Sequence, residues 1–138
     1  MGAWGAESFE NDDAADWSSG LEGADSFEVV RQALSVTEAP YVEAPDGSMA
    51  VAAAEVVAAA LGRPSASLPD AVREWVVANG SMAEPGDGSA ALAAVFRVRS
   101  DGSELRELWN EAGSEDWNRC LTDLSERLGF VTEGRAGR

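Results

Sequence analysis

One stretch of this 138-residue chain decides its fold: Ser48-Met-Ala-Val-Ala-Ala-Ala-Glu-Val-Val-Ala-Ala-Ala-Leu61. Alanine and leucine are strong helix formers, and the helix that this stretch predicts is apolar on almost every side. A helix of that kind has to be covered by other elements over most of its surface, and Gly62 provides its end. We therefore expect residues 48–61 to form the central helix of the domain.

The segments around this stretch carry helical periodicity rather than the alternation of strands. The motif Asp25-Ser-Phe-Glu28 predicts a capping box, followed by a helix with Phe27, Val30 and Leu34 on one face. Residues 39–47 contain two prolines and predict a connection. Near the C-terminus, a helix beginning at Ser114 would bury four residues at i, i+4, i+7 and i+11: Trp117, Leu121, Leu124 and Leu128.

Helix-start and helix-end signals place four more helices. They are expected from Asn11 to about Gly20, from Pro69 to Asn79, from Ser89 to Val98 and from Ser103 to Gly113. The glycine-rich residues 80–88 predict a flexible loop, and residues 95–98 would also suit a short strand.

Together these elements predict an all-α fold, a compact bundle of six or seven helices around the helix at 48–61. We expect a single domain over residues 1–130 and a frayed polar tail at 131–138. On the outer face of the last helix, spacing of four residues predicts two ion pairs, Glu115–Arg119 and Asp123–Arg127.

The opening of the chain predicts a packed N-terminal segment: Met1-Gly-Ala-Trp-Gly-Ala-Glu-Ser-Phe-Glu-Asn-Asp-Asp-Ala-Ala-Asp-Trp17. We expect Trp4 and Phe9 to be buried as structural anchors of this segment. Asn11 is expected to cap the first helix with its side-chain oxygen. Trp17 is expected to join the core, as are the three later tryptophans: Trp75, Trp109 and Trp117.

This opening resembles that of the bacterial proteins grouped as domain of unknown function 4259. Their sequences begin Met-Gly-x-Trp-Gly, then a phenylalanine, then Asn-Asp-x-Ala-Ala-Asp and an aromatic residue. Two later stretches are also similar to the family: Ala53–Val57, and Ser103–Gly113 followed by Trp117. The resemblance implies a bacterial source and one domain across these stretches. It implies no activity, cofactor or catalytic residue.

Composition excludes several kinds of chemistry. The chain has no histidine, so it cannot contain a Ser-His-Asp triad, a histidine base or a histidine-ligated zinc. Its only cysteine, Cys120, can form neither an internal disulfide nor a cysteine metal cluster, and we expect a buried structural thiol. We expect no signal peptide and no membrane span, because no basic leader and no long apolar run occur. These features favour a cytoplasmic protein.

Negative charge is concentrated in the first third of the chain. The net charge is −15, and residues 1–50 hold 11 acidic residues against Arg31 alone. Such a surface repels nucleic acid and acidic membranes, so we expect neither as a partner. A basic protein is the partner that it favours. The acidic residues without an evident local task include three that we take as candidate partner-binding residues: Glu38, Glu43 and Asp46.

A carboxylate metal site is the alternative interpretation. Asp12, Asp13 and Asp16 lie within one helical turn, and Glu55 is the only charge in the central helix. Oxygen ligands of this kind suit Mg²⁺ or Ca²⁺, and the site would then support metal-assisted hydrolysis. Helix capping accounts for the aspartates without a metal.

A buried Glu55 would need a hydrogen-bond donor. The donors that we consider are the Trp4 indole, the N-terminal backbone, and an arginine such as Arg106, so that Glu55 would anchor the N-terminal segment. The leading hypothesis is therefore a non-enzymatic interaction module that binds or inhibits a basic protein, with no cofactor. The alternative is a metal-dependent enzyme.

Overall fold

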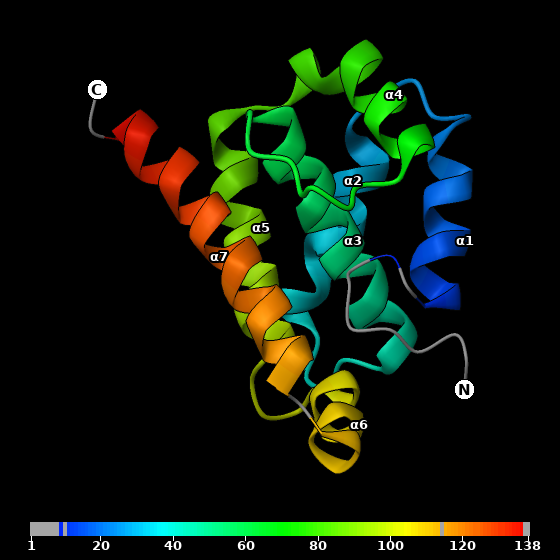
Figure 1. Cartoon of the computed structure of the whole chain (residues 1–138), viewed down its shortest axis with the longest axis vertical. Coiled ribbons are helices and arrows are strands. Elements are labelled where there is room, and N and C mark those ends of the chain that lie inside the picture. Colours follow the sequence, from blue (N-terminus) through cyan, green and yellow to red (C-terminus); the bar gives the residue numbers. More distant parts are fainter. Residues whose placement is uncertain (1–8, 10, 114, 137–138) are drawn as a thin grey trace.

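The helix α3, Ala44–Ala60, runs through the middle of the molecule (Figure 1). A computed structural model describes residues 9, 11–113 and 115–136 of the chain, with side chains as far as Gly129. These residues contain no strand, which confirms the all-α prediction. They form seven α-helices and two short 3-10 helices: α1 (Asp12–Leu21), α2 (Glu28–Ala33), η1 (Leu34–Glu38), α3, α4 (Asp70–Asn79), η2 (Gly80–Met82), α5 (Pro85–Val98), α6 (Glu104–Ala112) and α7 (Glu115–Ala136).

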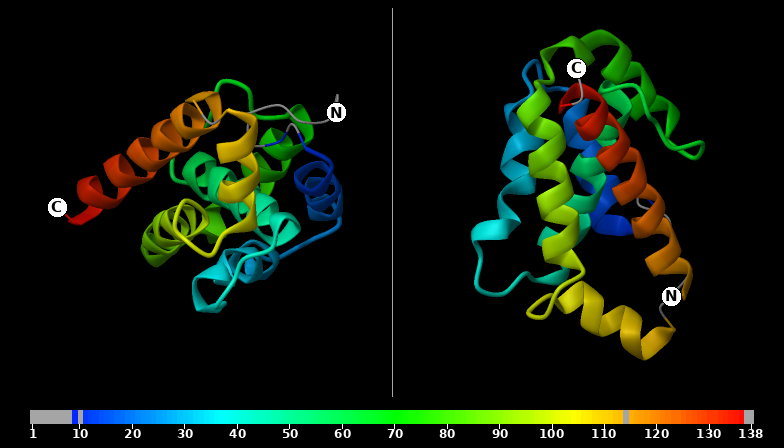
Figure 2. Two further views of the ribbon diagram at one scale, coloured as in Figure 1. Left: turned by 90° about the horizontal axis from the view of Figure 1, so that it is seen from below. Right: turned by 90° about the vertical axis from the view of Figure 1, so that its left-hand side faces the viewer.

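Every other helix in the described part of the chain packs against α3. Figures 1 and 2 show α1 and α5 on opposite sides of it, with α7 beside α5. Eleven residues of α3 are buried, among them every residue from Ala50 to Ala58. This all-round burial is what an apolar helix of alanine and valine requires, and it confirms α3 as the centre of the domain.

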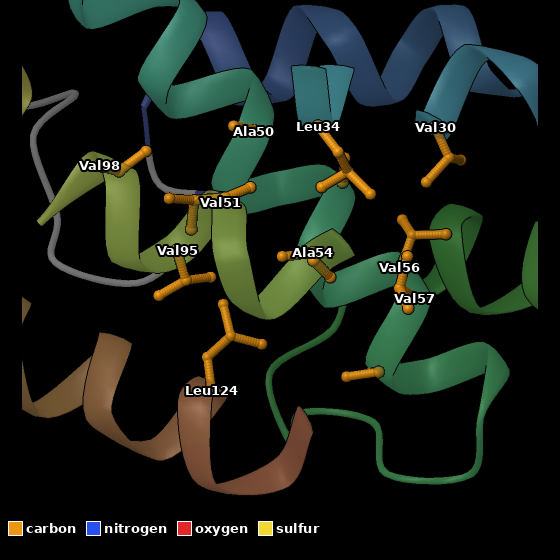
Figure 3. Packing of buried hydrophobic residues seen from close by; sticks show 14 of the residues in the cluster. Val30, Leu34, Ala50, Val51, Ala54, Val56, Val57, Val95, Val98 and Leu124 are labelled. Carbon is orange, nitrogen blue, oxygen red and sulfur yellow. The ribbon is translucent and has the colours of Figure 1, made fainter. Parts of the chain in front are cut away.

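The core lies where α3 meets its neighbours, and small and branched side chains fill it. Figure 3 shows Leu124 of α7 pointing towards Val95 of α5, and Val30 of α2 pointing towards Val56 of α3. The predicted faces of α2 and α7 are confirmed, because all their members are buried: Phe27, Val30, Leu34, Trp117, Leu121, Leu124 and Leu128.

The helix α3 begins four residues earlier than predicted, and the connection before it is correspondingly shorter. Pro45 lies in the first turn, where the missing N–H of proline breaks no helical hydrogen bond. The backbone N–H of Ala44 donates to the Glu104 Oε1 atom over 2.8 Å. A side chain 60 residues away thus caps the helix, and local sequence patterns do not reveal such a cap.

The loop before α3 is tied to the loop before α6. The backbone N–H of Val42 donates to the Gly102 carbonyl over 2.8 Å, and the N–H of Glu104 donates back to the Val42 carbonyl over 2.8 Å. Gly102 has a φ of +83°, which favours glycine. The Arg97 guanidinium braces both loops by donating to four backbone carbonyls: Ala39, Pro40, Asp101 and Gly102.

Two further predicted helix starts are wrong. The capping box at Asp25 does not form: α2 begins at Glu28, whose N–H donates to Ser26 Oγ over 3.3 Å. The expected loop at 80–88 and helix start at Ser89 are also wrong, because η2 and the first turn of α5 occupy this segment. There Glu84 and Asp87 form a reciprocal capping box, and Pro85 lies in the first turn. Residues 95–98 belong to α5 and form no strand.

The helix α6 starts and ends much as predicted, and α7 starts within one residue of the predicted Ser114. Gly113 follows α6 with a φ of +101°, as expected for the residue that ends a helix. The Asp123–Arg127 pair forms over 2.8 Å, but Arg119 pairs with Asp116 rather than Glu115. The helix α7 extends to Ala136, and the fraying of residues 131–138 stays a prediction.

Arg31, the only base of the first 50 residues, has a structural partner. Its guanidinium donates to both carboxylate oxygens of Asp87, over 2.9 and 3.0 Å, and lies 5.4 Å from the centroid of the Phe27 ring. Burial raises the pKa of Asp87, but hydrogen bonds from Arg31 and from the Glu84 backbone lower it more, so its net pKa lies below the ordinary value. The pair joins α2 to the start of α5.

We expect Asp87→Asn to lower the free energy of unfolding by about 2 kcal/mol at pH 7, because it weakens charge-assisted hydrogen bonds at a buried site. The pKa of Asp87 is lower in the folded state than in the unfolded chain, where it is about 3.9. Its stabilising contribution is therefore complete above that value and disappears as the pH falls through the folded-state pKa.

Urea unfolding of both proteins at pH 7 and at pH 3 measures this difference. Asp101→Asn, at a fully exposed carboxylate, is the control and should cost little at either pH. A difference between wild type and Asp87→Asn that stays constant with pH would contradict the assignment.

Candidate functional site

A groove of about 450 Å³ opens between α1, the α2–η1 segment and the start of α3. Six of its lining residues are apolar or carry long apolar side chains: Trp17, Val29, Ala33, Val36, Ala39 and Met49. Three are polar: Gln32, Ser35 and Asp46. We call this cleft the η1 groove. Its size falls within the range of roughly 300–1,000 Å³ that is typical of ligand-binding clefts.

The α2–η1 segment supplies most of the groove because it has two apolar faces. One face, with Phe27, Val30 and Leu34, is buried in the core. Three further apolar residues of the segment line the groove: Val29 and Ala33, which are half-buried, and Val36, which is buried. Sequence periodicity predicted only the first face. The second apolar series was the signal that could have revealed the groove.

The three candidate partner-binding residues are all exposed and lie on the loop between η1 and α3 or beside it. Asp46, in the first turn of α3, lines the η1 groove directly. Glu38 is the last residue of η1, and Glu43 immediately precedes α3. The structure therefore places one of the three in the groove and the other two at the ends of the loop next to it.

Negative charge also surrounds Tyr41, which is exposed on the same loop. Its hydroxyl donates to Glu107 Oε1 over 3.0 Å. The pKa of Tyr41 is raised by partial desolvation, by that hydrogen bond, and by the charges of Glu107, Glu104 and Glu43. Arg31 is the only arginine among residues 1–50, and it pairs with Asp87 rather than with the carboxylates around Tyr41.

The candidate metal ligands are not brought together. Asp12, Asp13 and Asp16 are exposed on α1, whereas Glu55 is buried in α3. Within the described residues, no group of three or more carboxylate or thiol side chains is arranged to hold a metal ion. Asn11 acts as the predicted cap, since its Oδ1 atom accepts from the Ala14 N–H over 2.8 Å, with Asp12 and Asp13 in the first turn.

Glu55 is held by an arginine, but by Arg127 of α7 rather than Arg106. The guanidinium donates to both Glu55 oxygens, over 3.0 and 3.2 Å, and also to Asp123 and to the Arg63 carbonyl. Burial lowers the pKa of Arg127, but its hydrogen bonds and charge interactions with Glu55 and Asp123 raise it above the ordinary value. Arg106 instead pairs with Asp101. The other donors considered, the Trp4 indole and the backbone of residues 1–8, lie outside the described residues.

The predicted anchors are only partly internal. Phe9 and Trp17 are half-buried and pack against the core, and Trp17 also borders the groove. Trp75 and Trp117 are buried as predicted, whereas Trp109 is half-buried and stacks on Trp117. Cys120, which was expected to be buried, is half-buried.

Comparison with known proteins identifies the family of the chain. In the described part, no helix has the length and apolar character needed to cross a membrane. No curated protein and no solved structure gives a significant match. A family described as "Domain of unknown function (DUF4259)" matches residues 2–119, a range that extends from before α1 into α7. This agrees with the resemblance of the opening and of the two later stretches, and the chain belongs to the DUF4259 family.

Proposed function

We propose that this protein is a non-enzymatic interaction module that binds or inhibits a basic bacterial protein. The observation that carries the proposal is the η1 groove, an apolar cleft in the most acidic third of the chain. Protein interfaces commonly combine an apolar centre with a polar rim. Here the groove would supply the centre, and the exposed carboxylates Glu38, Glu43 and Asp46 would supply charge at the rim.

Electrostatics supports a basic partner over other classes. The net charge of −15 attracts a basic protein and speeds its association, whereas it repels phosphate backbones. The proposed binding uses no metal or cofactor. We place the protein in the cytoplasm, because a chain with a single cysteine forms no internal disulfide and needs no oxidising compartment to fold.

Site-specific photo-crosslinking tests whether this face binds a protein. A photoreactive side chain of similar length in place of Gln32, an exposed residue of the groove lining, is compared with one in place of Ser89, which is exposed on α5. The expected result is a basic protein that is cross-linked from position 32 but not from position 89, and less efficiently at high salt. Equal labelling from both positions, or labelling of acidic proteins alone, would contradict the proposal.

With that partner purified, we expect neutralisation of the loop carboxylates to slow association. The triple variant Glu38→Gln, Glu43→Gln and Asp46→Asn should reduce the association rate constant about tenfold at low ionic strength, because steering depends on unscreened charge. Its melting temperature should be unchanged or higher, since repulsion among 11 nearby acids decreases. Stopped-flow association at increasing salt measures the effect.

A matched control removes the same amount of charge elsewhere, at three exposed residues: Glu74→Gln, Glu111→Gln and Glu126→Gln. We expect its association rate to stay close to that of wild type. If both triple variants slowed association equally, the association rate would depend on the net charge of the protein and not on the position of these three carboxylates.

A further inference from the structure

The η1 groove combines features that suit a particular kind of segment. Its walls are formed by Trp17, Val36 and Met49, which are contributed by three different elements. Tryptophan is frequent at the centre of protein interfaces, and methionine adapts its shape to a bound side chain. A single carboxylate, Asp46, lies in the lining of this apolar cleft.

We infer that the η1 groove receives a large apolar side chain of a basic protein segment, with a neighbouring arginine or lysine pairing with Asp46. This inference rests on the proposed function and deepens it, because it names the element of the partner that is recognised. A purely apolar segment would cover the apolar lining of the groove but would have no positive charge to pair with Asp46. A purely basic segment would leave the walls exposed to water.

The chemistry of the site favours this occupant over a second copy of the chain. Two copies meeting at this face would bring together two segments that each hold 11 acids and Arg31. The Arg31 guanidinium could not relieve that repulsion, because it is bound to Asp87 and to the Met82 carbonyl. Asp46 and Trp17 both line the groove, so an arginine of a basic partner would pair with the Asp46 carboxylate next to a tryptophan, whose ring attracts guanidinium groups.

Peptide binding to the full chain tests the inference without requiring the natural partner. The probes are capped seven-residue peptides in which Phe, Leu, Met or Trp lies between two arginines. Two control peptides replace the apolar residue with alanine or the arginines with glutamine. We expect at least one probe to bind with a dissociation constant below about 1 mM, and both controls to bind at least tenfold more weakly.

Variants that close the groove without changing charge locate the site. Ala33→Phe and Ser35→Trp place a large side chain in the lining, and both should weaken the probe at least tenfold. Circular dichroism shows whether Ala33→Phe folds. If it does not, Ser35→Trp still tests the groove, because Ser35 is exposed and its replacement leaves the core intact. Ala93→Phe, at an exposed site on α5, is the control and should bind as wild type does. Asp46→Asn should weaken the arginine probes and leave the glutamine control unchanged.

The outcomes separate this inference from the proposed function. If the groove-closing variants bind the probe and the cross-linked partner normally while the acidic triple variant does not, the groove inference is overturned and the proposed function stands. If no probe binds below about 1 mM, the inference is also overturned. Sedimentation that shows a dimer lost in Ser35→Trp would assign the groove to a second copy instead. If neither groove nor charge variants affect any partner, both proposals fail.

Discussion

Replacing Arg127 with alanine should lower the free energy of unfolding by about 3 kcal/mol or more. The Glu55 side chain is 3% exposed, and the Arg127 side chain that pairs with it is 11% exposed. Removing that guanidinium takes from the buried carboxylate two charge-assisted hydrogen bonds and the positive charge of Arg127. The cost of desolvating an uncompensated charge far exceeds the value of an exposed ion pair.

A double variant shows whether the charge or the shape of the site matters. Glu55→Leu combined with Arg127→Leu removes both charges and keeps apolar volume, so it should recover most of the stability lost in Arg127→Ala. Asp123 loses its arginine in both proteins, but its side chain is 65% exposed and can be solvated by water.

Arg119→Ala is the matched control, because Arg119 also lies on α7 and pairs with an aspartate. Both partners of that pair are about three-quarters exposed, so the loss should be at most about 1 kcal/mol. Urea unfolding at pH 7, followed by circular dichroism, measures all the variants. Equal losses in Arg127→Ala and Arg119→Ala would show that the Glu55 pair does not hold α7 against α3.

The contrast between these arginines also shows what sequence patterns can predict. Periodicity together with helix-start and helix-end signals predicted each α-helix of the described residues, since each helix buries one face or, for α3, nearly all of its surface. It also identified Glu55 as an exceptional charge. Its partner is 72 residues away on α7, and no local pattern specifies that pairing.

Helix starts failed where prolines and glycines were interpreted as loops. Pro45 and Pro85 both lie in first turns, and their helices are capped by groups that the loop interpretation ignored: Glu104 for α3, and Glu84 with Asp87 for α5. The groove was missed for a related reason. Val29, Ala33 and Val36 form a second apolar series, and how far each residue is covered depends on how α1 and α3 pack around the segment.

Phe27→Ala should destabilise the domain by about 3–5 kcal/mol, because it removes a buried ring from a close-packed site. Phe27 is 1% exposed, and its ring stacks on Trp75 with centroids 5.9 Å apart. The Arg31 guanidinium lies over the same ring at 5.4 Å and holds Asp87, so the ring supports both α4 and the start of α5. The Trp75 indole N–H donates to the Ala24 carbonyl over 3.1 Å, which limits how far Trp75 can move to fill the cavity.

Phe96→Ala makes the same chemical change on the surface. Phe96 lies in α5 with 55% of its surface exposed, so its loss should change the free energy of unfolding by no more than about 0.5 kcal/mol. Both phenylalanines occur among valines in helical segments, and they differ in burial because the helices around α3 cover Phe27 and leave Phe96 exposed. Thermal and urea unfolding measure the free energy of unfolding of the two variants. If Phe96→Ala cost as much as Phe27→Ala, α5 would have to be covered on its outer face, and the arrangement of helices described above would be wrong.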